Sequence, residues 1–346
     1  MNHKKKVFLG VSNTAGICSR LKKGFESIGI EADYYSFSEH IFGYKSDKII
    51  SFSKFSLIRK FQKVFLMTKL IIKYDYFIFD SIFTMLTDYA DIKLLQKFGR
   101  KAILIFTGCD VRAPEKVIGY KWNPCRDCIE EYKRFTGCFY LERKKKFVRA
   151  IENVFDIIVC PQEASGFLVR DFTKAYFPIN LEDFPKEKFQ SYHSKSKLRI
   201  LHAPSNPVYK GSQYIYTAIE KLKSEFDFEF KVVTGVTIDV LYNEINNSDL
   251  IIDQVLVGNY GLFAIESMAM YKPVVCYVRE DSWNDIKEDC PVFNADPDSL
   301  YEVLKKILSN PSQLAEAGKR SREFVEKYHD ASKIVKQYLE LFENNN

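Results

Sequence analysis

Short apolar runs alternate with longer amphipathic stretches along most of this sequence. In the first half, apolar runs at 7–11, 32–37, 76–80, 102–106 and 157–160 predict strands, and the stretches between them have the spacing of helices. Strands that are apolar throughout are typical of a parallel sheet covered on both faces. The pattern therefore predicts an α/β protein.

The alternation stops between Pro178 and Lys197 and then begins again. The intervening segment contains Pro178 and Pro185, several Lys and Ser residues and little periodicity, as in a linker between domains. A chain of 346 residues is long enough for two domains of ordinary size. We therefore predict two doubly wound Rossmann-like domains, at residues 1–178 and 198–328. They would face each other across a cleft, because open parallel sheets bind ligands at the carboxyl ends of their strands.

The two halves of the sequence carry opposite net charges. Residues 1–180 contain 31 Lys and Arg against 19 Asp and Glu, a net charge of +12, whereas residues 181–346 contain 20 against 26, a net charge of −6. The 29 Phe and 21 Tyr residues can fill a large core, which excludes disorder for most of the chain. We expect the two domains to face different partners.

A glycine loop before a helix is the most informative segment. In VGNYGLFAIESMAMYKPVVCYV, residues 257–278, a predicted strand is followed by Gly258 and Gly261 and then by a helix that begins near Leu262. Such a loop lets backbone N–H groups approach an anion, and Glu266, near the first helical turn, can accept bonds from a pair of hydroxyls. Glycine loops are weak signals, so a plain loop with a solvated Glu remains open from spacing alone.

This segment resembles the donor site of GT-B glycosyltransferases of family 4, whose motif reads E-G-F-G-L-x-x-x-E-A-M-A-x-G-K-P-V. The sequence keeps Glu266, which in the family binds the ribose of the donor nucleotide, but has Gly258 at the first glutamate. Asn259, Asp253 or Gln254 could take that residue's place near the donor sugar. The resemblance implies a donor site with the following residues: Lys210, Gly211, Gly258, Asn259, Gly261, Leu262, Phe263 and Glu266.

A second motif, His202 to Leu222, resembles the family's K-G pair at a helix start. The resemblance gives Lys210 the role of neutralising the donor diphosphate, which suits a cation at a helix N-terminus. Ser205 stands where the family has an arginine, so Arg199 or another arginine would compensate. A surface lysine is the alternative for Lys210.

Two loops of the first half resemble the acceptor side of the family. Gly16 would lie under the reaction centre, and Asn13 and Thr14 would line the cleft. Asp110 matches the family's H-G-x-D, with Thr107 at the histidine, and we assign it a catalytic role beside Lys210 and Glu266; a turn-capping Asp is the alternative. Arg112 could reach a phosphate. The resemblance also implies that residues 329–346 form a helix that crosses back onto the first domain.

The function implied is that of a retaining glycosyltransferase. It would move a hexose from a nucleotide diphosphate sugar to a sugar acceptor, either an oligosaccharide or a lipid-linked one, in surface polysaccharide biosynthesis, and would require no cofactor. A non-catalytic GT-B subunit that binds a nucleotide sugar is the alternative, because the first motif glutamate is missing. A sugar-nucleotide epimerase is a third possibility.

The cysteines predict either structural zinc or reduced thiols. Cys125, Cys128 and Cys138 have spacing that can hold zinc, with Cys109 as a candidate fourth ligand. The sequence shows no export signal or apolar run of membrane-spanning length, so we expect a cytoplasmic protein with reduced thiols.

Residues 54–73 predict a basic amphipathic helix, since they combine six Lys and Arg with apolar residues and contain no acid. Such a helix can lie on anionic lipid at the inner face of the membrane, or pack on the core with its basic face in water. A nucleic-acid partner is not expected, because no module signature appears.

Overall fold

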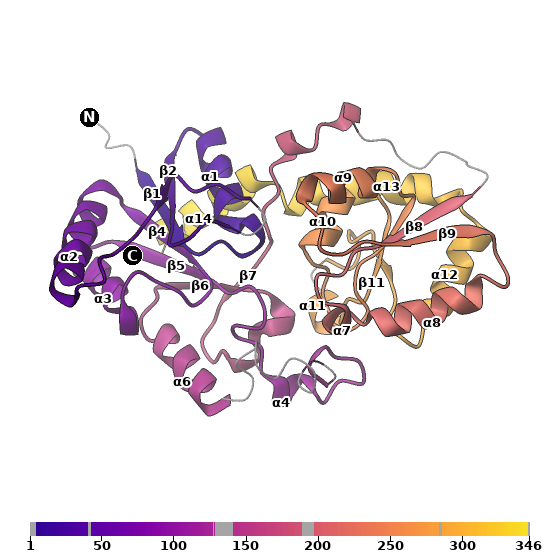
Figure 1. Cartoon of the computed structure of the whole chain (residues 1–346), viewed down its shortest axis with the longest axis horizontal. Coiled ribbons are helices and arrows are strands. Elements are labelled where there is room, and N and C mark those ends of the chain that lie inside the picture. The colour runs from indigo at the N-terminus through magenta and orange to yellow at the C-terminus, as the bar shows by residue number, and fades with distance from the viewer. Residues whose placement is uncertain are drawn as a thin grey trace. The chain divides into compact units, whose positions relative to one another are not determined.

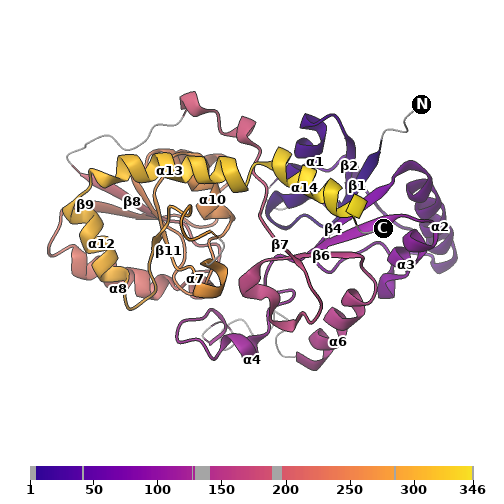
Figure 2. The same ribbon diagram turned by 180° about the vertical axis from the view of Figure 1, so that it is seen from behind.

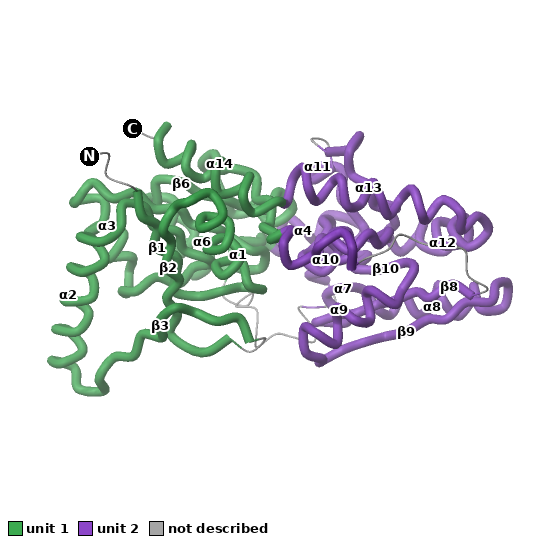
Figure 3. The backbone as a smooth tube through the Cα atoms, turned by 90° about the horizontal axis from the view of Figure 1, so that it is seen from above, with its two compact units in different colours: residues 1–113, 140–180, 330–346 green, residues 114–139, 181–329 purple. Residues whose placement is uncertain are grey.

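The computed structural model describes residues 5–40, 43–126, 128, 141–188, 197–283 and 286–344. The chain divides into two compact units, shown in green and purple in Figure 3. Unit 1 comprises residues 1–113, 140–180 and 330–346, and unit 2 comprises residues 114–139 and 181–329. Among the described residues, no helix is both long and apolar enough to cross a membrane.

Unit 1 is built on a parallel sheet of seven strands, five of which the apolar runs predict. The strand order is β3-β2-β1-β4-β5-β6-β7 (Figure 1). The strands are β1 Lys6–Val11, β2 Glu31–Ser36, β3 Lys48–Ile49, β4 Tyr76–Asp80, β5 Lys101–Ile105, β6 Ile157–Cys160 and β7 Thr173–Lys174. The central strands are buried along their length because helices cover the sheet.

The helices of unit 1 bury one face each against this sheet. They are α1 Ile17–Ser27, α2 Ser56–Lys73, α3 Ala90–Lys97, α6 Leu141–Glu152 and α14 Ala331–Asn344, with 3₁₀ turns η1 Thr14–Gly16, η2 Thr87–Tyr89 and η4 Gln162–Phe167. Phenylalanines dominate the core: the ring of Phe8 lies 5.5 Å from that of Phe77 and 6.2 Å from that of Phe79.

The last helix, α14, belongs to unit 1 and lies beside α1 (Figure 2). Gly24 of α1 permits this approach, because a Cβ there would lie 2.9 Å from the carbonyl oxygen of Ala331. At the other end, the ring of Phe342 stacks on Tyr76 at 4.3 Å. The position of α14 within unit 1 agrees with the helix that the resemblance implied.

Unit 2 contains a second parallel sheet, of five strands in the order β12-β11-β10-β8-β9. The strands are β8 Leu198–His202, β9 Phe228–Val232, β10 Leu250–Ile252, β11 Val274–Cys276 and β12 Phe293–Asn294. The helices are α4 Pro114–Val117, α7 Pro207–Lys210, α8 Ser212–Leu222, α9 Ile238–Asn246, α10 Leu262–Ala269, α11 Glu280–Trp283, α12 Leu300–Ser309 and α13 Gln313–Tyr328, with 3₁₀ turns η5 Leu181–Asp183 and η6 Lys186–Lys188.

Residues 114–139 lie in unit 2, whereas the sequence placed all of 1–178 in the first domain. Side-chain contacts explain the difference. The guanidinium of Arg279 lies 4.1 Å from the ring centroid of Tyr120, and the indole N–H of Trp122 donates to Asp298 at 2.9 Å. Hydrophobic periodicity carries no information on such contacts.

The helix predicted to start at Lys210 begins two residues later, as α8 at Ser212, and a separate short helix, α7, ends at Lys210. Gly211 between them has φ +77°, and a Cβ there would lie 2.8 Å from atoms of Val255 and Leu256. The left-handed backbone therefore ends α7 and starts α8, so Lys210 is the last residue of a short helix.

Candidate functional site

Lys210, Asp253 and Gly261 meet at the carboxyl edge of the sheet in unit 2. Asp253 follows β10, and its fully buried carboxylate accepts a bond from the Lys210 ammonium at 2.5 Å. Its second oxygen accepts the N–H of Gly261 at 3.2 Å. Asp253 therefore holds the lysine and the glycine loop together.

The side chain of Lys210 is largely buried between Asp253 and the first turn of α10. Its side chain is 13% exposed, and its ammonium lies 5.1 Å from the ring centroid of Phe263. In the described part of the chain, the N–H groups of Leu262 and Phe263, in the first turn of α10, donate to no acceptor. A cation and the N-terminus of a helix, side by side, form a place for an anion.

Glu266 lies just past the first turn of α10, as the sequence predicted. It is the fifth residue of the helix and is 5% exposed. One carboxylate oxygen accepts the hydroxyl of Tyr242, on α9, at 3.0 Å, and the ring of Tyr242 in turn lies edge-on against Phe184 at 5.3 Å. No pattern in the sequence points to Tyr242, because only the packing of α9 against α10 pairs it with Glu266.

An arginine lies alongside the position of the missing glutamate. Gly258 has φ +86°, and a Cβ there would lie 3.2 Å from Cβ of Arg279, whose N–H donates to the carbonyl of Gly258 at 2.9 Å. The Arg279 guanidinium is bound by both carboxylate oxygens of Asp281, at 2.6 and 2.7 Å, and is stacked on Tyr120. A buried arginine, neutralised by Asp281, therefore lies next to Gly258, where the family has its first glutamate.

The residues suggested as substitutes for that glutamate are engaged within the loop. Asp253 binds Lys210, and the carboxamide of Gln254 accepts the N–H of Val257 at 2.6 Å and donates to the carbonyl of Tyr277 at 2.9 Å. Asn259 accepts the N–H of Tyr260 with its own side chain at 3.0 Å. Asp253 and Gln254 thus shape the loop.

His202, at the end of β8, is a buried neutral histidine beneath Lys210. Its Nδ1 lies 2.9 Å from the carbonyl oxygen of Ile252, which can only accept, so Nδ1 carries the proton. Nε2 then accepts the hydroxyl of Ser212 at 2.8 Å. Burial lowers the pKa of His202 to about 4, and the proximity of Lys210 acts in the same direction.

In unit 1, the predicted loop residues Asn13 and Gly16 order the turn that opens α1. The Asn13 side chain accepts the N–H of Cys18 at 2.8 Å and donates to Ser19 at 2.9 Å. Gly16 has φ +82°, and a Cβ there would lie 2.5 Å from the ring of Tyr44. Asn13 is buried, so it supports the loop from below.

Asp80 is a residue that motif matching missed. It ends β4 and is fully buried; one carboxylate oxygen accepts the N–H of Thr14, and the other has no partner among the described residues. Burial raises the pKa of Asp80 to about 7. The signal available was an Asp directly after an apolar strand, at the ligand-binding edge of a parallel sheet.

Asp110 caps its own turn, and Arg112 is buried. The Asp110 carboxylate accepts the N–H groups of Thr107 at 3.0 Å and Gly108 at 2.8 Å, and burial raises its pKa. The Arg112 guanidinium pairs with buried Glu163 at 3.4 Å. In this structure Asp110 has the geometry of a turn cap and Arg112 faces Glu163; the catalytic role of Asp110 stays a prediction.

The candidate zinc ligands are only partly described. Cys125 and Cys128 are buried, whereas Cys138 lies outside the described residues. Within the described ranges, no group of three or more His, Cys, Asp or Glu side chains could hold a metal ion.

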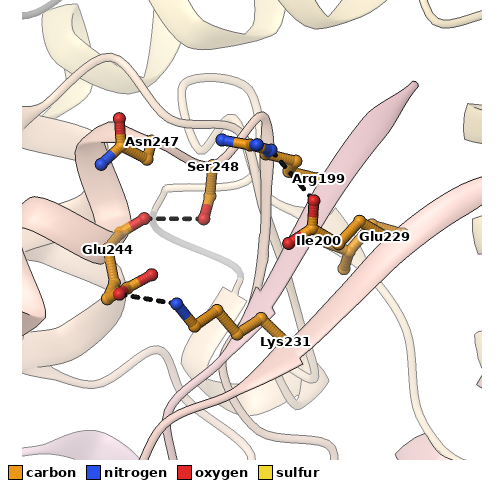
Figure 4. A pocket seen from close by; sticks show the side chains of 7 residues that line it. All are labelled: Arg199, Ile200, Glu229, Lys231, Glu244, Asn247 and Ser248. Atoms are coloured by element: carbon orange, nitrogen blue, oxygen red, sulfur yellow. Dashed lines mark hydrogen bonds and ion pairs between the residues drawn. The ribbon is translucent and has the colours of Figure 1, made fainter. Parts of the chain in front are cut away.

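Arg199 lies toward the other edge of the sheet from Lys210. It is near the start of β8 and pairs with Glu229 at 3.1 Å, beside a cavity of about 180 Å³ (Figure 4). Lys231 and Glu244 form a second ion pair there at 2.7 Å. The suggestion that Arg199 compensates for the missing motif arginine is therefore wrong, because Arg199 lies near the start of β8, at the edge of the sheet away from Lys210, and its guanidinium pairs with Glu229.

No protein-family model matches the sequence, and no curated protein matches it by sequence. Solved structures do match over nearly the whole chain. Sucrose-phosphate synthase from Thermosynechococcus elongatus is 14% identical, with a TM-score of 0.63, covering 98% of this chain and 99% of that one. HepE from Anabaena in complex with UDP-glucose is 12% identical, with a TM-score of 0.61 and coverages of 98% and 99%.

An α-glucosyltransferase in complex with UDP-glucose and DNA is 10% identical, with a TM-score of 0.59 and coverages of 98% and 99%. At such low identity these similarities establish the fold. The chain therefore has the GT-B fold, with two Rossmann-like domains, that these glycosyltransferases share.

Proposed function

We propose that this protein is a retaining glycosyltransferase that transfers a hexose from a nucleotide diphosphate sugar to a sugar acceptor. The observation that carries the proposal is the Lys210–Asp253 pair at 2.5 Å beside the N-terminus of α10. Two of the neighbours with this fold, HepE and the α-glucosyltransferase, are described in complex with UDP or UDP-glucose, which supports a nucleotide sugar as the donor.

Lys210 and α10 would stabilise the leaving diphosphate. Negative charge develops on that group as the glycosidic bond breaks, and preorganised donors at such a point are commonly the largest catalytic contribution. The N–H groups of Leu262 and Phe263 lie at this point, and Asp253 holds the ammonium of Lys210 and the N–H of Gly261 beside them. This arrangement would do the work of a metal ion, so no cofactor is required in the proposed reaction.

Glu266 would bind the ribose hydroxyls of the donor. Its carboxylate can accept several hydrogen bonds, and the hydroxyl of Tyr242 donates one of them. Tyr242 is a positioning residue in this proposal, because it fixes the carboxylate from the neighbouring helix α9. Gly211, Gly258 and Asn259 would complete the donor loop.

The acceptor would bind to unit 1, near the loop that contains Asn13 and Gly16, with Asp110 close to the reaction. We propose a lipid-linked saccharide acceptor and a role in surface polysaccharide biosynthesis at the inner face of the cell membrane. Unit 1 supports this choice, since it carries 28 Lys and Arg against 18 Asp and Glu in the sequence, a net charge of +10. We also propose, separately, that Cys125, Cys128 and Cys138 bind a structural zinc ion.

The test is a panel of UDP-, GDP- and ADP-sugars incubated with the full chain, with slow donor hydrolysis and transfer to lipid-linked acceptors as readouts. Glu266→Gln should lower turnover at least a hundredfold, and Tyr242→Phe should raise KM more than it lowers kcat. Glu244→Gln is the matched control, because Glu244 pairs with Lys231 beside the cavity at the other edge of the sheet.

Three outcomes would contradict the proposal. Nucleotide-sugar binding without turnover, even with lipid-linked acceptors, would indicate the non-catalytic subunit that the Gly258 substitution suggests. Isomerisation of the donor without an acceptor would indicate an epimerase. A product of inverted anomeric configuration, seen by NMR, would exclude the retaining mechanism.

A further inference from the structure

Helix α2 has two apolar faces, and the core of unit 1 uses only one of them. Met67, Leu70 and Ile71 are buried in the core. A second set of large apolar side chains on the same helix is exposed to solvent, and we call it the outer stripe: Leu57, Phe61, Val64, Phe65 and Ile72. Phe61 is 71% exposed and Phe65 is 62% exposed.

The outer stripe follows the repeat of an α-helix. Successive members are separated by 4, 3, 1 and 7 residues, which places them on one side of a helix with 3.6 residues per turn. On that repeat, the centre of the stripe lies about 120° around the axis from the centre of the buried face. The stripe is therefore an outward face of α2, distinct from the face that the core covers, and Phe55 at the N-cap is a further exposed ring near its start.

Cations flank the outer stripe on both sides: on the same helical repeat, Lys60 and Lys69 lie at its two edges, whereas Arg59 and Lys63 lie on the far side of α2. Lys54, Arg59, Lys60, Lys63 and Lys69 lie on or just before α2, and none of them has an acidic partner within the described residues. The ammonium of Lys69 lies 4.3 Å from the ring centroid of Phe65. Residues 54–73 contain no Asp or Glu.

We propose that the outer stripe of α2 docks this protein on an anionic lipid surface, with the stripe among the acyl chains and the lysines at the head groups. An amphipathic helix with aromatic and aliphatic residues on one face and basic residues at its sides is suited to that interface. A second copy of the chain fits poorly, because a symmetric contact would bring two sets of cations together. A nucleic acid would leave the apolar stripe without a partner.

This inference extends the proposed function, because a membrane-bound enzyme would meet a lipid-linked acceptor at the surface to which it docks. It does not depend on the donor chemistry, however, since α2 contains none of the residues assigned to the donor site. The two proposals can therefore fail separately.

The test is flotation of the full chain with vesicles of phosphatidylcholine alone or with about 30% phosphatidylglycerol. We expect binding to the anionic vesicles at least tenfold stronger than to the neutral ones, weakening as salt is added. Lys54→Ala with Lys60→Ala should lower the partition coefficient about 25-fold, at about fivefold per cation. Lys306→Ala with Lys319→Ala, exposed lysines of unit 2, should leave it unchanged.

Phe61→Ser with Phe65→Ser should reduce binding at least tenfold, because it removes two inserted rings. Phe98→Ser is the matched control, since Phe98 is an exposed ring at the C-cap of α3. A Trp reporter gives an independent measurement: Phe61→Trp should shift its emission to the blue and be quenched by brominated lipid, whereas Phe98→Trp should not respond.

Equal binding to neutral and anionic vesicles, or undiminished binding of the Phe61→Ser, Phe65→Ser variant, would overturn the proposal. So would a dimer, seen by sedimentation velocity without lipid, that this variant dissociates, because the stripe would then be an interface between copies. Donor hydrolysis by the stripe variants should equal that of the wild type. If the wild type lacks donor chemistry but binds vesicles, the proposed function fails while docking stands.

Discussion

Replacing Lys210 with Met separates the structural role of this lysine from its chemical role. The substitution keeps a long flexible side chain but removes the ammonium, which leaves the carboxylate of Asp253, fully buried, without its counterion. Removing one partner of a buried ion pair typically costs about 3–5 kcal/mol. Since Lys210 is itself 13% exposed and water can enter from its side, we expect about 3 kcal/mol.

A double-mutant cycle with Asp253→Asn tests the origin of that cost. Asp253→Asn alone should cost about 1–3 kcal/mol, because the amide still accepts a bond but the lysine loses its partner. The double variant should be more stable than the sum of the two single effects predicts, with a coupling energy of about 2 kcal/mol.

Urea unfolding followed by Trp fluorescence is the assay, because both tryptophans of the chain, Trp122 and Trp283, belong to unit 2. Lys231→Met is the matched control: its ion pair with Glu244 is about half exposed on the lysine side, so it should cost less than about 1 kcal/mol. The reasoning is refuted if Lys210→Met is no more destabilising than Lys231→Met.

Three further predictions concern buried or constrained residues. The pKa of Asp80 is raised from 3.8 to about 7, so the native state holds a proton that the unfolded state has released, and stability should fall as the pH rises from 4 to 7. Asp80→Asn should remove this dependence in urea unfolding followed by circular dichroism. The pKa of His202 is lowered from 6.5 to about 4, so stability should fall as the pH drops from 6.5 to 4, and His202→Gln should abolish that loss in Trp-monitored unfolding. Gly16→Ala should destabilise unit 1 by at least about 1 kcal/mol more than Gly43→Ala in thermal unfolding, because both glycines have positive φ but only Gly16 faces a ring.

Much of the fold could be predicted because apolar strands and amphipathic helices leave a periodic record in the sequence. The strand predictions at 7–11, 76–80 and 157–160 lie within one residue of β1, β4 and β6. The start of α10 at Leu262 was also predicted, since the glycine loop before it marks the change from strand to helix.

Contacts between segments far apart along the chain could not be predicted from the sequence. The Tyr242–Glu266 bond depends on how α9 packs against α10, and the place of residues 114–139 in unit 2 depends on single side chains such as Tyr120. Arg112 had the charge to bind a phosphate, but whether its guanidinium faces solvent or Glu163 is decided by packing. Pattern matching identifies residue types at positions, and it carries no information on what each side chain already binds.

The double engagement of Asp253 has a consequence for donor binding. In the structure, this carboxylate holds both Lys210 and the N–H of Gly261, the groups that a diphosphate would contact. The cation nearest the missing glutamate, Arg279, is likewise neutralised by Asp281. A diphosphate must therefore compete with the carboxylate of Asp253 for Lys210 and for the N–H of Gly261. A neutral residue at that position would lower the competition while keeping the loop bond, so the Asp253→Asn variant that weakens folding should bind UDP more tightly than the wild type. Weaker UDP binding by that variant would instead mean that Asp253 acts by holding Lys210 in the position that the diphosphate needs.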